Sequence, residues 1–190
     1  MTTIVFAHPW HGSFNKAILD TATKELQNNK TAYQVIDLNK DGFSPVMTEN
    51  ELALYARGES QDPSVNKYQS MLKVTDRLVF IFPLWWYDVP AVLKGFFDKV
   101  MLKDFAWTES GTGLKGKLTH IQSAMVITTA QSPKWYIKYF AGNTIQSTFI
   151  RATLKGIGIK NVKWLHCSDI SHGASEKRKA FLKKIVSEIK

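Results

Sequence analysis

Five apolar, β-branched runs, separated by segments of helical period, restrict the fold of this chain more than any other feature. The runs cover residues 3–7, 33–38, 78–83, 121–128 and 160–167. Residues 78–82 show no polar alternation, so both faces of that strand should be buried, as in a parallel sheet flanked by helices. Regular alternation of strand and helix predicts an α/β fold with right-handed crossovers.

Between the strands, the periodicity of apolar residues predicts helices at residues 15–26, 92–102, 144–154 and 175–189. Five strands suit a flavodoxin-like three-layer α/β sandwich, with a five-stranded parallel sheet of order 2-1-3-4-5. No repeat, low-complexity tract or linker is visible, so we expect a single domain over residues 1–190. In such a fold the ligand lies beyond the carboxyl ends of strands 1, 3 and 4.

Two connections, residues 39–61 and 103–117, are long enough to cover a site or a partner surface. The second contains a Gly-x-Gly-x-x-Gly match at residues 111–116. It precedes a strand, whereas a dinucleotide fingerprint follows one, so we interpret it as a flexible loop. His166, Cys167 and His172 lack a second pair of ligands, which predicts no metal site and a buried thiol at Cys167.

The net charge is +9, and residues 96–190 carry 16 Lys and Arg against 6 Asp and Glu. These charges are spread over several predicted elements, which indicates a solvated face or attraction of a phosphate-bearing substrate. No interleaved basic and aromatic motif is present, so no nucleic-acid partner is expected. A single cysteine, no secretory leader and no apolar stretch of about 18 residues predict a cytoplasmic protein without a disulfide or a membrane span.

The exits of strands 1 and 4 carry small polar residues. Strand 1 leads through His8-Pro9-Trp10-His11-Gly12-Ser13-Phe14-Asn15 into a helix, with Ser13 or Asn15 suited to the N-cap. Free amides at a helix start bind phosphate. Strand 4 ends in Thr128-Thr129-Ala130-Gln131, whose hydroxyls and amides could reach the polar edge of the same ligand.

Three adjacent aromatic residues follow strand 3, in Pro83-Leu84-Trp85-Trp86-Tyr87. Adjacent side chains point in different directions, so the three cannot all belong to the core. Such a loop would stack on a flat ligand and hydrogen-bond it through amides. The alternative is a dimer interface, where Trp and Tyr are also favoured.

Taken together, these motifs resemble the NAD(P)H:quinone oxidoreductases with a flavodoxin-like fold. The resemblance rests on Ala7-His8-Pro9 with Ser13-Phe14-Asn15, on Pro83-Leu84-Trp85-Trp86-Tyr87 running into Val89-Pro90-Ala91, and on Thr128-Thr129. It covers nearly the whole chain in the same order. The length is similar to that of a short bacterial branch, which includes general-stress quinone reductases and ancillary subunits of potassium-efflux systems.

That resemblance implies a homodimeric flavin enzyme in which the partner chain completes each site. FMN, or alternatively FAD, would be the cofactor and NAD(P)H the co-substrate, with quinone-like acceptors reduced by hydride transfer in a ping-pong mechanism. His8, Ser13, Phe14 and Asn15 would hold the flavin phosphate, and Pro83, Leu84, Trp85, Trp86 and Tyr87 would line the ring. The pyrimidine side would meet Thr128 and Thr129, followed by Ala130 and Gln131, and Tyr136 would be the catalytic residue.

Two departures from the family pattern are visible. Ala130-Gln131 stands where many members have Gly-Gly, and residues 137–142 lack the histidine that some members carry after the tyrosine. Two further readings within the same fold are an electron-carrier flavodoxin and a flavin-binding regulatory subunit of a membrane potassium-efflux transporter. A carrier usually has an acidic surface, which this basic chain lacks.

Overall fold

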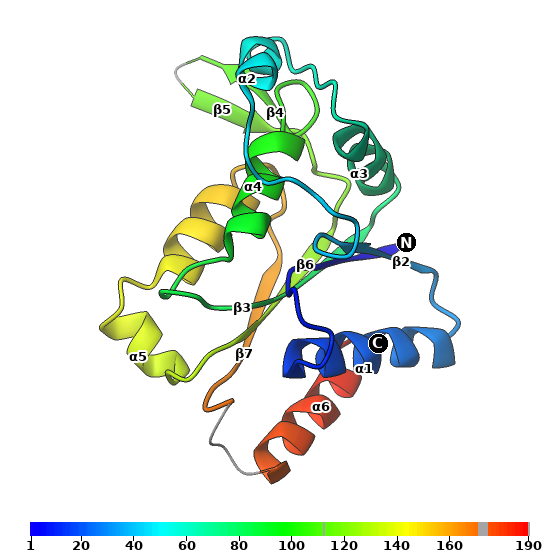
Figure 1. Ribbon diagram of the computed structural model, residues 1–190, viewed down its shortest axis with the longest axis vertical. Helices are drawn as coiled ribbons and strands as arrows, with labels where there is room; N and C mark the ends of the chain where they lie inside the picture. Colours follow the sequence, from blue (N-terminus) through cyan, green and yellow to red (C-terminus); the bar gives the residue numbers. More distant parts are fainter. Residues whose placement is uncertain (112, 171–174, 190) are drawn as a thin grey trace.

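Five parallel strands form the centre of the protein in the computed structural model, which describes residues 1–111, 113–170 and 175–189 (Figure 1). They are β1 (Thr2–Phe6), β2 (Tyr33–Asp37), β3 (Arg77–Pro83), β6 (Ser123–Thr129) and β7 (Val162–Cys167). Their order is β2-β1-β3-β6-β7, and all four pairings are parallel. Counted among the five parallel strands alone, this is the predicted 2-1-3-4-5 order, which is confirmed.

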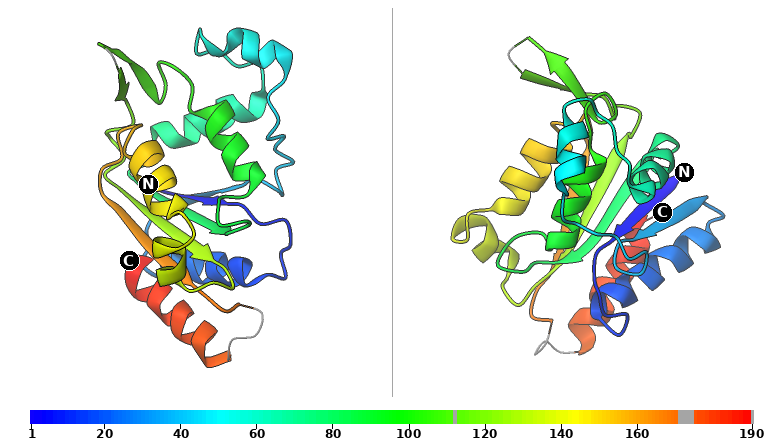
Figure 2. Two further views of the ribbon diagram at one scale, coloured as in Figure 1. Left: turned by 90° about the vertical axis from the view of Figure 1, so that its left-hand side faces the viewer. Right: turned by 45° about the horizontal axis from the view of Figure 1, so that its top comes forward.

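Helices cover both faces of the sheet (Figures 1 and 2). One face carries α1 (Phe14–Asn28) and α6 (Ser175–Ile189), which pack against each other. The opposite face carries α3 (Pro63–Lys73), α4 (Ala91–Val100) and η1 (Ile145–Leu154), the last a π-helix. The four helices expected from periodicity are therefore present, with ends shifted by at most two residues.

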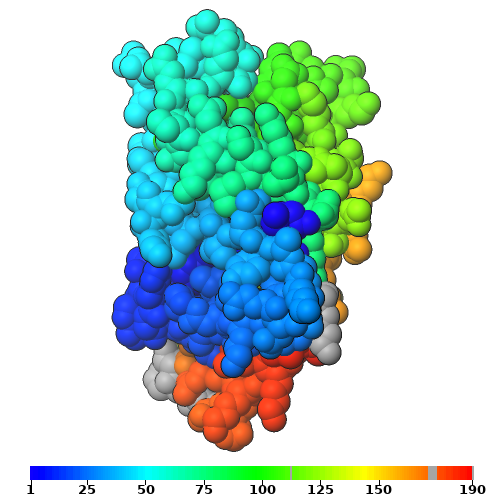
Figure 3. All heavy atoms as spheres, turned by 90° about the vertical axis from the view of Figure 1, so that its right-hand side faces the viewer, coloured from blue at the N-terminus to red at the C-terminus, as the bar shows by residue number. Residues whose placement is uncertain are grey.

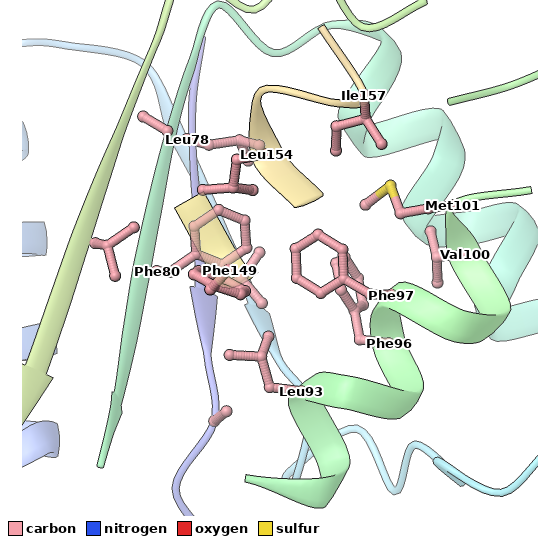
Figure 4. Packing of buried hydrophobic residues seen from close by; sticks show 14 of the residues in the cluster. Leu78, Phe80, Leu93, Phe96, Phe97, Val100, Met101, Phe149, Leu154 and Ile157 are labelled. Carbon is pink, nitrogen blue, oxygen red and sulfur yellow. The ribbon is translucent and has the colours of Figure 1, made fainter. Parts of the chain in front are cut away.

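The uninterrupted apolar run of β3 is explained by two separate cores. Val79 and Ile81 pack with α1 and α6, whereas Leu78, Phe80 and Phe82 pack with α4 and η1. Phe80 is fully buried, and its ring centroid lies 5.7 Å from that of Phe97 and 5.4 Å from that of Phe149 (Figure 4). A strand covered on both faces needs apolar side chains at every position, which its sequence supplies.

Both long connections contain regular structure that was not predicted. The first holds α2 (Glu49–Tyr55), followed by α3. In the second, β4 (Trp107–Ser110) pairs with β5 (Gly113–Gly116) as an antiparallel hairpin, so the flexible-loop interpretation of residues 111–116 is wrong for the strand residues. Gly116 is needed because a Cβ there would lie 2.2 Å from the carbonyl carbon of Ile157.

A buried ammonium group ties the first of these connections to α4. The Lys99 side chain is 4% exposed, and its Nζ lies 2.8 Å from Glu51 Oε1 and 2.9 Å from Asp62 Oδ2. Nζ also donates to the carbonyl oxygen of Ser44 at 3.1 Å. Three points between residues 44 and 62 are therefore held by one cation on α4, the helix that follows the aromatic loop.

Figure 3 shows α1 and α6 at one end of the molecule, while α2 and the β4–β5 hairpin lie at the other. Within the described ranges, no helix has the length and apolar character needed to cross a membrane.

Candidate functional site

The loop between β1 and α1 presents a cluster of unpaired amides. Ser13 is the N-cap, since its Oγ accepts from the backbone N–H of Lys16 at 3.2 Å. Among the described residues, the N–H groups of Phe14 and Asn15 have no acceptor. Amides at the start of a 15-residue helix, together with its dipole, favour an anion such as phosphate.

A second observation at the same place points to a ligand. Asn15 is 3% exposed and lines the cavity beside this loop, and its Nδ2 donates to Thr129 Oγ1 at 2.8 Å. Its Oδ1 is buried and accepts no hydrogen bond from the described protein. A buried acceptor left unpaired costs about 1–3 kcal/mol, so this oxygen is suited to accept from a hydroxyl of a bound molecule.

The loop itself is held by specific contacts. His11 Nε2 lies 2.9 Å from Asp37 Oδ2 at the end of β2, which fixes the loop to the neighbouring strand. The indole of Trp10 lies against Gly12, where a Cβ would come within 2.5 Å of the ring. Gly12 is thus required for Trp10 to take its place at the cavity, although Trp10 remains 67% exposed.

An aromatic wall faces these amides. The ring centroids of His8 and Trp85 are 6.3 Å apart, and both residues line the cavity with Pro83 and Leu84. Burial lowers the pKa of His8, and its Nδ1 accepts from the backbone N–H of Trp10 at 3.1 Å. The imidazole is therefore neutral at physiological pH and carries its hydrogen on Nε2.

The aromatic loop turns sharply at Trp86 and Tyr87. Trp85 and Asp88 exchange backbone hydrogen bonds, each 3.1 Å long, around this two-residue turn. The central residues have φ values of 53° and 63°, the left-handed region that costs side-chain-bearing residues about 1–2 kcal/mol each. Backbone strain of this kind clusters at functional sites. In this turn Trp86 is 96% exposed. The backbone N–H groups of Trp86 and Tyr87 have no acceptor in the described chain.

Replacing Trp86 with glycine should stabilise the protein by about 0.5–1 kcal/mol, because glycine adopts positive φ without strain and the exposed indole contributes little packing. Urea denaturation measures the change. Trp86→Ala is the matched control, since it removes the same ring and keeps the strained backbone. Equal unfolding midpoints for the two variants would show that the turn stores no strain.

Further aromatic side chains continue from the turn. Tyr87 lies 6.0 Å from Tyr136 of α5 (Lys134–Tyr139), measured between ring centroids. Tyr136 stacks on Phe140 at 5.8 Å, and Trp135 packs edge-on against both. These four residues, which we call the aromatic cluster, are all at least 37% exposed.

Most of the predicted site residues share one open cavity of about 360 Å³. The lining residues include ten that the sequence singled out: His8, Ser13, Phe14, Asn15, Pro83, Leu84, Trp85, Thr129, Ala130 and Gln131. Trp10 and Ile170 also line it and were not predicted. Trp86, Tyr87 and Tyr136 lie outside the lining, on the turn and in the aromatic cluster.

Thr128 is also outside the cavity, because neighbouring residues of a strand point to opposite faces. Its hydroxyl is 2.8 Å from both Trp164 Nε1 and His166 Nδ1, on the η1 side of the sheet. Thr129 faces α1 instead and meets Asn15.

Cys167 is buried, as predicted, and burial raises the pKa of its thiol. His172 lies outside the described residues. Within the part of the chain that is described, no three His, Cys, Asp or Glu side chains are grouped so as to hold a metal ion.

The donor set fits a flavin. Unpaired amides and the Ser13 hydroxyl suit its phosphate, the unpaired Asn15 Oδ1 suits a ribityl hydroxyl, and Trp85 with Leu84 offers an apolar wall to a flat ring. All of these lie beyond the carboxyl ends of β1, β3 and β6, beside the point where the strand order reverses. Fold and site together define a doubly wound α/β protein whose cavity has the donors and the apolar wall suited to a phosphate-bearing ligand with a flat ring.

The chain belongs to the family described as having a flavodoxin-like fold, whose model matches residues 1–189. It is 29% identical over 181 residues to an uncharacterized NAD(P)H oxidoreductase from Haemophilus influenzae, covering 94% of this chain and 89% of that one. It is 30% identical to NAD(P)H dehydrogenase [quinone] 1 of Rattus norvegicus over 155 residues, which span 70% of this chain and 54% of the rat enzyme.

Solved structures show the same relationship. Smu.1420 from Streptococcus mutans superimposes with a TM-score of 0.87 and 30% identity, covering 99% of this chain and 97% of that one. The NAD(P)H:quinone oxidoreductase from Methanothermobacter marburgensis gives a TM-score of 0.87 and 27% identity, with 99% and 96% covered. The resemblance to NAD(P)H:quinone oxidoreductases is confirmed.

Proposed function

We propose that this protein is a flavin-dependent NAD(P)H:quinone oxidoreductase that binds FMN in the cavity described above. The unpaired Asn15 Oδ1 beside the unpaired amides of α1 carries the proposal, because it marks a ligand with both hydroxyls and an anionic group. The names of the relatives support the activity.

When bound, a flavin would accept hydride from a reduced nicotinamide and pass two electrons to a quinone. The chain's own part is to bind and orient. The α1 amides and Ser13 hold the phosphate, Thr129 and Asn15 orient the ribityl chain, and Trp85 packs on the ring. The N–H groups of Trp86 and Tyr87 are oriented donors for negative charge that develops at the ring edge.

Exposed apolar groups around this site favour a homodimer. The aromatic cluster is uncovered, and a second cavity of about 250 Å³ lies between α4 and η1, lined by residues that include Phe97, Met101 and Phe149. The β4–β5 hairpin extends away from the sheet at one end of the molecule (Figure 2), and an isolated two-stranded hairpin is marginally stable in water. A second copy that covers these groups would bury them.

The visible spectrum of the purified protein, followed by anaerobic NADPH and then a quinone, tests the activity. We expect a flavin spectrum that bleaches with NADPH and recovers with the quinone, and parallel initial-rate lines from one pocket used alternately. A flavin that NADPH cannot bleach would favour an electron carrier or a transporter subunit. No flavin after soaking with FMN and with FAD would overturn the site assignment.

A further inference from the structure

A chain of three side-chain hydrogen bonds lies behind the cavity wall. Trp164 Nε1–H donates to Thr128 Oγ1 at 2.8 Å, Thr128 Oγ1 is 2.8 Å from His166 Nδ1, and His166 Nε2 is 2.9 Å from the carbonyl oxygen of Ser132. A carbonyl can only accept, so Nε2 must carry a hydrogen. Nδ1 of the neutral ring then accepts the hydroxyl hydrogen of Thr128. Every donor in these three hydrogen bonds has an acceptor only when His166 is neutral.

These three hydrogen bonds anchor the segment that follows β6. Ala130 and Gln131 line the cavity, and Ser132 ends the segment at the His166 ring. The backbone supplies two other anchors, from the Ala130 N–H to the Cys167 carbonyl and from the Asp169 N–H to the Gln131 carbonyl, each 3.1 Å long. His166 is thus a side-chain anchor for a short cavity wall that is attached to β7 and the residues after it.

A second proton on the His166 ring would leave one donor of this arrangement without an acceptor. It would sit on Nδ1 and face Thr128 Oγ1, which would then lose the acceptor for its own buried hydrogen. Burial lowers the pKa of His166, and the hydrogen bond to Ser132 only partly offsets this. The positive charges of Lys134 at the start of α5 and of Lys177 on α6 lower the pKa further, and Lys177 lies 4.0 Å from the Asp169 carboxylate.

We propose that His166 is a positioning residue for the cofactor: its neutral form holds the wall formed by residues 130–132 in place, and its protonation releases that wall and weakens flavin binding. The cofactor part of this inference rests on the proposed function. The effect on the wall itself does not, because the hydrogen bonds belong to the protein alone.

The direction of the pH dependence follows from the lowered pKa. A released or unfolded segment exposes a histidine that titrates near pH 6.5, whereas the closed wall disfavours the proton. The closed position of the wall is therefore fully favoured above about pH 7. Below pH 6.5 the equilibrium constant for closure falls by up to about tenfold per pH unit, until the pH passes the pKa of His166 in the closed state.

Two substitutions test the roles of the two ring nitrogens of His166 one at a time. In His166→Gln, the side-chain amide reaches about as far as Nε2, so it keeps a donor for Ser132 and cannot titrate. In His166→Asn, the shorter amide reaches about as far as Nδ1 and loses Ser132. In the Gln variant the Thr128 hydroxyl loses its acceptor at every pH, so we expect FMN binding up to about tenfold weaker than wild type at pH 7.5 and no acid-induced weakening. The Asn variant should bind about tenfold more weakly at every pH.

FMN fluorescence quenching between pH 5 and 8 measures these affinities, and hydrogen exchange of the peptide covering residues 129–133 in the flavin-free protein measures the wall directly. We expect the protection factor there, which is exchange corrected for the intrinsic rate at each pH, to fall with acid in wild type and not in His166→Gln. His120→Gln is the matched control, since His120 bonds the Leu72 carbonyl at 3.1 Å, away from the cavity, and it should behave as wild type.

Identical pH profiles for wild type and His166→Gln, in affinity and in exchange, would overturn the inference, as would wild-type affinity in His166→Asn. If wild type binds no flavin at any pH, the proposed function fails instead. The exchange measurement then still decides whether His166 holds the wall.

Discussion

Lys99→Met is expected to lower the free energy of unfolding by about 3 kcal/mol, because it leaves two partly buried carboxylates without their cation. Glu51 and Asp62 are 14% and 20% exposed, so water relieves part of the cost and the loss should lie at the low end of the range for buried pairs. The ammonium also lies 5.3 Å from the ring centroid of Phe43, a contact that methionine would replace in part. Urea denaturation of the purified protein measures the change.

Lys94→Met is the matched control on the same helix. Its partner is Asp98, and the side chains are 65% and 44% exposed, so its removal should cost no more than about 0.5 kcal/mol. Adding Glu51→Gln and Asp62→Asn to Lys99→Met should restore part of the stability, since both amides keep the helix caps and remove the unpaired charges. A loss in Lys99→Met no larger than in Lys94→Met would contradict the assignment.

The same cluster predicts an acid dependence. Burial alone would raise the pKa of Glu51 and of Asp62, but the hydrogen bonds and charge of Lys99 hold the pKa of both carboxyls below the usual value. Their stabilising effect is therefore complete at neutral pH and is lost as the pH falls below the ordinary carboxyl range, about 4. The stability difference between wild type and Lys99→Met should accordingly narrow between about pH 5 and pH 3.

Much of the fold follows from residue patterns that physical rules constrain tightly. The central strand was recognisable because Leu78, Phe80 and Phe82 alternate with Val79 and Ile81, which leaves no polar face. The β4–β5 hairpin was missed because β5 is Gly-Leu-Lys-Gly, with no β-branched run to mark a strand. Its pairing depends on a close approach of Gly116 to a distant backbone, which no local pattern encodes.

In the candidate site, too, some features could be predicted from the sequence and others could not. The residues of the loop between β1 and α1 are predictable because they follow an apolar strand and precede an amphipathic helix. The separation of Thr128 from Thr129 could have been foreseen, since a period of two places neighbours on opposite faces of a strand. The positive φ values of Trp86 and Tyr87 could not, because aromatic residues disfavour that region and only the turn between Trp85 and Asp88 imposes it. Trp10 and Ile170 reach the cavity through loop conformations that depend on the tertiary structure.

Asn15→Asp is expected to weaken FMN binding by about 100-fold while leaving the fold intact. The new carboxylate would lie in the cavity beside the α1 amides, where we place the phosphate. Two unit charges roughly 5 Å apart repel by about 3 kcal/mol at an effective dielectric constant of about 20, which corresponds to about 100-fold in affinity. The donor to Thr129 is lost as well. Fluorescence titration with FMN at pH 7.5 measures the change.

Asn28→Asp makes the same chemical change at the exposed far end of α1, so it should bind FMN as wild type does. Asn15→Leu removes both the Nδ2 donor and the Oδ1 acceptor without adding charge and should weaken binding by about tenfold, which separates hydrogen bonding from repulsion. An Asn15→Asp protein that binds FMN within threefold of wild type would place the phosphate elsewhere. Equal losses in the Asp and Leu variants would instead show that no anionic group of the ligand lies close to Asn15, and the α1 amides would then need another anion.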